Sequence, residues 1–352
     1  MKVRPQVVLP EDIRVTATTR AALPRAPAAV GLIAVALLIV YVVWGSTYLG
    51  IRVVVEEAPP FLGMGSRFFV AGVLLAAVLA IRSGLGRLRV TRSELVGCAA
   101  VGLMLPVLGN GLVSVGENLG APSGVTALLI ASAPLVIAIF RFASGDRPHA
   151  WSVFGLLLGF VGLTYLVLVG RNTGGDDRVP LGAALLVLFA STCWAFGSWV
   201  QPRLTLPRDA FVMTVHEMWI GGAIMLVVGA LSGERLDLAA YSADTWIAWG
   251  YLVVFGSMVA FSAYVWLLAN APIGLVATYA YVNPVVAVAL GALILDEPIT
   301  RAVLIGGGVI VASVAIVISV ERVRRPDVSA PPDGVPPDGV PAGSAPPGQP
   351  SR

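Results

Sequence analysis

The feature that most constrains this fold is a series of long apolar runs that fills the middle of the chain. Each run holds about 20 mostly apolar residues, the length that a helix needs to cross a bilayer. The ten runs cover residues 30–51, 60–81, 94–116, 121–141, 151–170, 181–201, 210–232, 246–268, 272–294 and 303–320. The sequence therefore predicts an all-α membrane protein with ten transmembrane helices.

Composition excludes the alternatives to a helical membrane protein. Of the 352 residues, 57% are hydrophobic and 12% are charged, and that charged share is about half of what soluble domains carry. A water-soluble globule of this size needs more polar surface. A transmembrane β-barrel is also excluded, because its strands alternate in polarity over about 10 residues, whereas these runs are longer and do not alternate.

The residues that mark several other functions are sparse. Cys98 and Cys193 are the only cysteines, and with His149 and His216 they lack the spacing of a metal site. Lys2 is the only lysine, so the chain has no phosphate-binding loop of the Gly-Lys-Ser/Thr type. We therefore expect no metal, no other cofactor and no nucleic-acid partner.

Four segments divide the chain. Residues 1–27 form a basic tail that precedes the first apolar run, which we interpret as a retained helix because no convincing cleavage site accompanies it. Residues 28–170 and 181–320 hold five apolar runs each. Residues 326–352 are rich in Pro and Gly and carry too little apolar surface to offset the entropy of ordering, which predicts a disordered tail.

The distribution of Lys and Arg predicts the orientation in the membrane. With the N-terminus in the cytoplasm, 16 basic residues fall in the tails and links on the inner side and five on the outer side. Basic residues favour the cytoplasmic side of a membrane. We therefore expect both termini in the cytoplasm.

The two halves of the chain match each other at an offset of 150 residues. Seven identical pairs support this repeat: Trp44/Trp194, Gly72/Gly222, Pro122/Pro272, Gly124/Gly274, Pro134/Pro284, Asp146/Asp296 and Pro148/Pro298. Because each unit holds five spans, an odd number, the second unit is expected to be inverted relative to the first. Inverted repeats are typical of alternating-access transporters, whose substrate site lies near the repeat interface.

The order of short motifs resembles the EamA family of the drug/metabolite transporter superfamily. The motifs are Trp44-Gly45-Ser46-Thr47-Tyr48-Leu49, Pro59-Pro60 with Arg67, Gly109-Asn110, Pro122-Ser123-Gly124, Trp194-Ala195-Phe196-Gly197-Ser198, and Tyr279 to Ala287 followed by Asp296-Glu297-Pro298. The resemblance covers about residues 30–320. It implies ten helices in two five-helix halves and export of small metabolites or drugs across the bacterial inner membrane.

We therefore predict a secondary transporter that is not an enzyme and that carries a small-molecule substrate. Transport is expected to be coupled to protons. The expected partners are membrane lipids, and the expected state is a monomer or a homodimer. Two alternatives stay open. A membrane receptor or scaffold could have inherited the same fold. An intramembrane enzyme would need a nucleophile and a base within the helices, and Ser46 and Ser198 have no His or Lys at a matching depth.

Polar and aromatic residues inside the predicted helices are the candidates for substrate binding. They are Trp44, Thr47, Arg67, Asn110, Trp194, Glu217, Tyr281 and Asn283. The two tryptophans are repeat mates that lie too deep for the interfacial belt. Tyr279 is an alternative to Tyr281, because the two cannot both face the same way. For each residue the competing interpretation is packing or hydrogen bonding between helices.

Two charged residues, Arg67 and Glu217, are also repeat mates and lie about 10 Å from the helix ends. Charges at that depth are costly and are most often functional. The alternative is an ion pair between the two, or between Arg67 and Glu117. Unpaired and facing the cavity, Glu217 is the candidate for proton coupling.

Pro134 and Pro284 are predicted to kink the middle of two equivalent helices and to line the pathway. A proline there frees the carbonyl four residues earlier, at Ile130 and Ala280. The alternative is a kink that serves packing alone.

Overall fold

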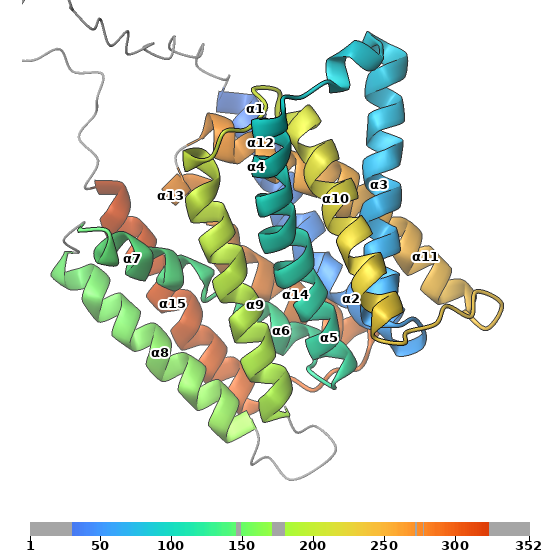
Figure 1. The fold of residues 1–352 in the computed structure, drawn as a ribbon. Coiled ribbons are helices and arrows are strands. Elements are labelled where there is room, and N and C mark those ends of the chain that lie inside the picture. Colours follow the sequence, from blue (N-terminus) through green and yellow to red (C-terminus); the bar gives the residue numbers. More distant parts are fainter. Residues whose placement is uncertain (1–29, 146–148, 171–179, 272, 277, 324–352) are drawn as a thin grey trace, which may run out of the picture.

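The computed structural model describes residues 30–145, 149–170, 180–271, 273–276 and 278–323. All regular elements in this part of the chain are helices (Figure 1). The α-helices are α1 (Val30–Ile39), α2 (Gly45–Glu57), α3 (Pro60–Ser83), α4 (Arg92–Gly102), α5 (Leu112–Asn118), α6 (Ser123–Ile130), α7 (Ala133–Ala143), α8 (Ala150–Gly170), α9 (Leu181–Val200), α10 (Ala210–Leu231), α11 (Ala243–Tyr251), α12 (Ser262–Asn270), α13 (Ile273–Val276), α14 (Tyr279–Ile294) and α15 (Arg301–Val323). The two predicted tails lie outside the described residues.

The helices confirm the predicted all-α membrane class. Seven stretches are long and apolar enough to cross a membrane by length and composition: Gly31–Glu57, Pro60–Ser83, Arg92–Asn118, Ser123–Phe140, Leu181–Arg203, Ala210–Leu231 and Ala243–Asn270. Three shorter apolar helices are Ala150–Leu166, Val282–Ile294 and Arg301–Ile316. Within the described residues, each predicted run thus contains helix, but only seven stretches meet the length criterion for a span.

Wider helical turns interrupt three of the long helices. These π-helical segments are η1 (Val40–Trp44) between α1 and α2, η3 (Leu103–Gly111) between α4 and α5, and η5 (Leu252–Phe261) between α11 and α12. The 150-residue offset carries η3 onto η5 almost residue for residue, so the two halves share this irregularity. Such segments occur often at functional sites.

The helix predicted over residues 121–141 is divided in two. A turn at Ala131–Ser132 separates α6 from α7. Pro134 is the second residue of α7, where its missing N–H breaks no helical hydrogen bond, so the helix is interrupted just before Pro134 instead of being kinked at it, and its role in lining the pathway stays a prediction. The Ile130 carbonyl accepts a hydrogen bond from Ser191 Oγ of α9 at 3.3 Å, so a neighbouring helix satisfies it.

The equivalent segment of the second half divides at a different place. Helix α13 ends at Val276, and α14 begins at Tyr279. Pro284 consequently lies inside α14, as predicted.

The most extensive helix contacts join α3 to α10 and α8 to α15, which are equivalent helices of the two halves. In both pairs the helices run antiparallel: Gly65 faces Met225 whereas Gly72 faces Trp219, farther along α3. Small residues permit these contacts. A Cβ atom on Gly222 would stand 2.4 Å from the Phe69 backbone nitrogen, so only glycine fits there.

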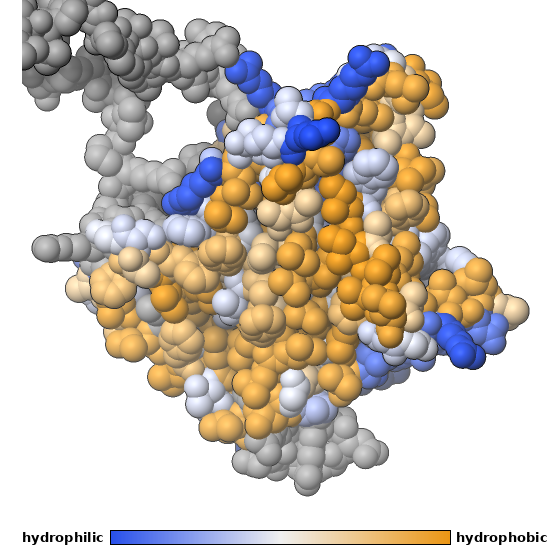
Figure 2. All heavy atoms as spheres, viewed as in Figure 1, coloured by the Kyte–Doolittle hydropathy of each residue, from blue (hydrophilic) through white to orange (hydrophobic). Residues whose placement is uncertain are grey.

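The outer surface matches the membrane environment that the helices require. Large apolar side chains such as Ile81, Leu231 and Leu293 are exposed on the helix surfaces. Figure 2 shows hydrophobic residues over the flank of the bundle and hydrophilic ones gathered toward its ends. A soluble monomer does not expose an apolar area of this extent.

Candidate functional site

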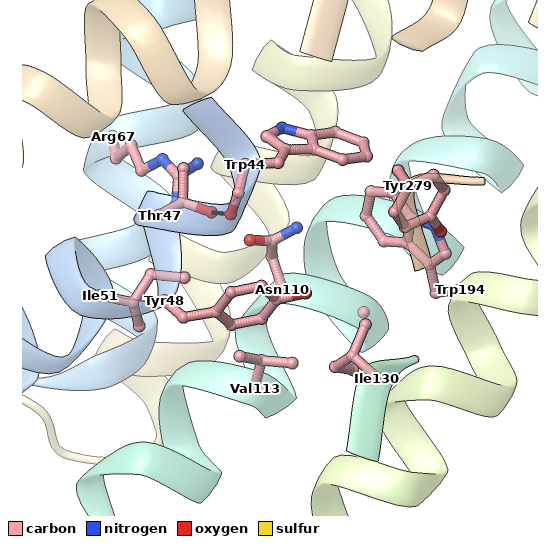
Figure 3. Close-up of a pocket in the computed structure, with 11 residues that line it drawn as sticks. Trp44, Thr47, Tyr48, Ile51, Arg67, Asn110, Val113, Ile130, Trp194 and Tyr279 are labelled. Atoms are coloured by element: carbon pink, nitrogen blue, oxygen red, sulfur yellow. Dashed lines mark hydrogen bonds between the residues drawn. The ribbon is translucent and has the colours of Figure 1, made fainter. Parts of the chain in front are cut away.

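A cavity lies within the bundle and is lined by residues of both halves of the chain (Figure 3). The empty space around its lining side chains, including the part that is open to solvent, is about 480 Å³. Five of the predicted binding residues line it: Trp44, Thr47, Arg67, Asn110 and Trp194. In Figure 3, Asn110 projects into the middle, with Arg67 and Thr47 on one side and Trp194 with Tyr279 on the other. The cavity therefore draws on both halves.

The π-helical segments bring several of these residues to the cavity. Trp44 is the last residue of η1, and Gly109 and Asn110 belong to η3. Gly109 permits close approach of α9, because a Cβ atom there would stand 2.7 Å from the Trp194 ring. The backbone irregularity thus sets the shape of the cavity wall.

An aromatic cluster adjoins the site and consists of Trp44, Trp194, Phe261, Tyr264 and Tyr279. Three of these residues, Trp44, Trp194 and Tyr279, line the cavity. The rings of the repeat mates Trp44 and Trp194 meet edge to face, with centroids 5.4 Å apart. The Trp44 ring lies 4.7 Å from Tyr264 and 5.7 Å from Tyr279. Trp44 Nε1 donates to the Gly256 carbonyl at 3.3 Å. These contacts fix the rings and leave apolar faces for a ligand.

Arg67 brings the only charge among the residues that line the cavity. Its side chain is 2% exposed. Its Nε donates to Ser257 Oγ of η5 at 2.9 Å, and its Nη1 lies 3.5 Å from Met64 Sδ. The guanidinium carbon stands 4.6 Å from the centre of the Phe68 ring. No carboxylate in the described part of the chain lies within ion-pair distance of Arg67, so it is paired with neither Glu217 nor Glu117.

Glu217 is buried in α10 but does not line this cavity. The α4 backbone packs against it, since a Cβ atom on Gly102 would stand 2.8 Å from the Glu217 carbonyl oxygen. Neither carboxyl oxygen has a hydrogen-bond partner. Of the two conditions set for proton coupling, Glu217 meets the first, being unpaired, and does not face the cavity in this conformation.

A second buried carboxyl without hydrogen-bond partners belongs to Glu117 in α5. Arg52 lies beside it, but its Nη1 donates to the Glu117 backbone carbonyl at 2.6 Å rather than to the carboxyl group.

Asn283 is buried in α14 and outside the cavity lining, and its amide atoms have no hydrogen-bond partner. The side chain of Tyr281 lies outside the described residues. Tyr279, the alternative to Tyr281, lines the cavity. It also borders a smaller pocket next to Pro134 and Ser198.

Six lining residues were not among the predicted binding residues: Tyr48, Ile51, Gly109, Val113, Ile130 and Tyr279. A periodic signal was available for two of them. Tyr48 and Ile51 follow Trp44 by four and seven residues and so share its helix face. Gly109 stands in the Gly109-Asn110 motif and Ile130 has the carbonyl that Pro134 leaves free, whereas Val113 carries no chemical signal of its own.

Acidic side chains from the links cap helix starts across the two halves. Glu234, between α10 and α11, accepts from the backbone N–H of Leu62 in α3 at 2.8 Å. Glu297, between α14 and α15, accepts from the backbone N–H of Ser123 in α6 at 2.8 Å. Such carboxylates stabilise a helix N-terminus, so both links hold one half of the chain against the other.

Comparison with known proteins relates the sequence of this chain to a transporter family. The model of the EamA-like transporter family matches twice, at residues 31–168 and 181–319. The inner membrane transporter YedA of Escherichia coli (strain K12) is 37% identical over 282 residues, which cover 80% of this chain and 89% of that protein. A protein of the same strain named "Probable amino-acid metabolite efflux pump" is 26% identical, covering 79% of this chain and 92% of its own length.

A solved crystal structure has the same fold. It covers 83% of this chain and 97% of its own, with a TM-score of 0.58 and 21% sequence identity. At that identity the match concerns the fold alone.

Proposed function

We propose, from the premise that this chain belongs to the EamA-like transporter family, that it exports small metabolites or drugs across the bacterial inner membrane by alternating access. The observation that carries the proposal is the central cavity, which is lined from both halves and holds five residues predicted from sequence. A cavity at a repeat interface is where alternating-access transporters bind substrate. The chain is a membrane transporter, and the two relatives reported above are named as a transporter and an efflux pump.

Reconstituted transport tests this function. Liposomes that contain the purified protein are loaded with a mixture of bacterial metabolites. The loss of each metabolite from the liposomes is followed by mass spectrometry. Asn110→Leu places an apolar side chain in the middle of the cavity and is expected to abolish the loss. Gly182→Ala is the matched control, because nothing lies within 4 Å of a Cβ atom at that position. Equal transport by both variants would exclude the cavity as the pathway.

Ten crossings in two inverted halves form the structural part of the proposal. The two family matches, the antiparallel pairs α3/α10 and α8/α15, and the matching π-helical segments η3 and η5 support it. The distribution of basic residues supports a cytoplasmic location for both termini.

Cysteine labelling tests this topology in a background without Cys98 and Cys193, both of which are buried. A cysteine at Asp237 is expected to react with an impermeant thiol reagent added to whole cells. A cysteine at Gly86, a position with open space around it, is expected to stay unreactive until the membrane is opened. The reverse pattern contradicts the orientation.

Proton coupling at Glu217 is the energetic part of the proposal. Its carboxyl group has no partner, so no ion pair has to be broken when it gains or loses a proton. Because Glu217 is buried here, proton exchange requires that water reach it in the other state of the transport cycle.

A further inference from the structure

We propose that the substrate is a small organic anion with an aromatic or apolar body and no ammonium group. The inference deepens the proposed function, on which it rests, by naming the chemical class that the cavity accepts. Three features of the cavity carry it: one unpaired cation, a wall of aromatic rings, and no acidic side chain among the lining residues.

The unpaired cation is Arg67. Its described contacts are the neutral partners Ser257 and Met64 and the ring of Phe68. A buried charge is costly unless an opposite charge meets it. Since no carboxylate of the described chain does so, a substrate that enters the cavity supplies the counter-charge. Arginine suits this role because its fork of donors matches a carboxylate or a phosphate.

The uncharged part of the substrate would contact the aromatic rings of the cavity wall. Trp44 and Trp194 stand edge to face next to Tyr279, and Ile51, Val113 and Ile130 complete the wall. A planar apolar body gains contact area against such rings at little entropic cost. Asn110 and Thr47 are the neutral polar groups that remain for orientation.

An ammonium group finds no counter-charge in this cavity. Glu117 and Glu217 are the buried carboxyls of the described chain, but neither is among the lining residues. An amino acid would carry its carboxylate to Arg67 and leave its ammonium group against apolar walls. We therefore expect the cavity to prefer an acid over the corresponding amino acid.

Four compounds with one body and different charges test the class. They are 3-phenylpropionate (an anion), phenylalanine (a zwitterion), phenethylamine (a cation) and 3-phenylpropanamide (neutral). Binding to the full chain in lipid nanodiscs is measured by isothermal titration calorimetry at pH 7. The anion is expected to bind about tenfold or more tightly than each of the others. Equal or tighter binding of the zwitterion, the cation or the amide would overturn the anion proposal, as would no binding of any of the four.

Variants of Arg67 assign the preference to its charge. Arg67→Gln is expected to bring the anion down to the affinity of the amide and to leave the amide unchanged, whereas Arg67→Lys keeps part of the preference. Should Arg67→Gln not fold, the Lys variant and the four-compound series on the unaltered chain still decide. A preference that survives in Arg67→Gln would refute the role of Arg67. The liposome screen with Asn110→Leu judges the transport function separately, because it uses a metabolite mixture of every charge type.

Discussion

Arg67 and Glu217 occupy equivalent positions in the two halves of this transporter, yet their surroundings differ. Arg67 lines the cavity and bonds to Ser257, whereas Glu217 lies against α4 with no partner for its carboxyl group. The offset of 150 residues explains the contrast, because it pairs Ser257 with Val107. The repeat thus reproduces the helices but not the polar partner, and under our proposal binding and coupling fall to different halves.

The first consequence concerns coupling. Glu217→Gln keeps the shape of the side chain and removes its titration. It is expected to abolish accumulation driven by a pH difference while leaving downhill exchange of substrate largely unchanged. Liposomes with an imposed pH difference measure both rates.

Glu117→Gln is the matched control, because it neutralises the other buried carboxyl that has no partner. It is expected to retain accumulation. If Glu217→Gln still concentrates substrate on a pH difference alone, Glu217 is not the coupling residue.

The second consequence concerns the helix pair that carries the two charges. Gly222→Ala forces a Cβ atom to within 2.4 Å of the Phe69 nitrogen, whereas Gly72→Ala brings one to within 2.9 Å of the Trp219 nitrogen. Overpacking typically costs about 1–3 kcal/mol. We expect Gly222→Ala to lower the midpoint of thermal unfolding in detergent more than Gly72→Ala does.

Gly182→Ala supplies the baseline for this series, since its Cβ atom meets open space. A Gly222→Ala protein as stable as Gly182→Ala would mean that α3 and α10 are not packed this closely.

The third consequence concerns the residues at positions 257 and 107, which are equivalent in the two halves. Ser257→Val removes the hydroxyl that accepts from Arg67 and makes this site resemble that of Glu217. Losing one such hydrogen bond costs about 0.5–1.5 kcal/mol, so anion affinity is expected to fall about three- to tenfold by calorimetry. Val107→Ser is the mirror substitution and is expected to leave anion affinity unchanged. Equal losses in both variants would show that the effect is not local to Arg67.

The sequence predicts those features of this molecule that depend on the free-energy cost of burying a residue in the membrane. The apolar runs predict the helices because length and hydropathy alone decide them. Trp44, Trp194 and Arg67 could be chosen because large rings and charges at that depth demand a special environment, and all three line the cavity.

The remaining site residues depend on contacts that one chain segment does not reveal. Ile130 reaches the cavity at the end of α6, next to the turn before α7, and Tyr279 does so because α14 starts there. The π-helical segments rotate the residues that follow them, so the face presented by Asn110 cannot be read from a regular period. The equivalence of Glu217 and Arg67 in the repeat predicts that both line the cavity. The repeat does not extend to Ser257, the hydrogen-bond partner of Arg67, because Val107 occupies the equivalent position.

The smallest expected effect is the interaction between the two charges themselves. Because Arg67 and Glu217 form no ion pair and share no described hydrogen-bond partner, their effects on stability are expected to add. The double variant Arg67→Gln with Glu217→Gln should change the free energy of unfolding by the total of the single changes, to within about 0.5 kcal/mol. Reversible unfolding of the original protein and of the single and double variants in the same detergent measures the four free energies of this double-mutant cycle. A coupling above about 1 kcal/mol would mean that the charges meet in another state of the transporter, and the division of binding from coupling between the two halves would then have to be abandoned.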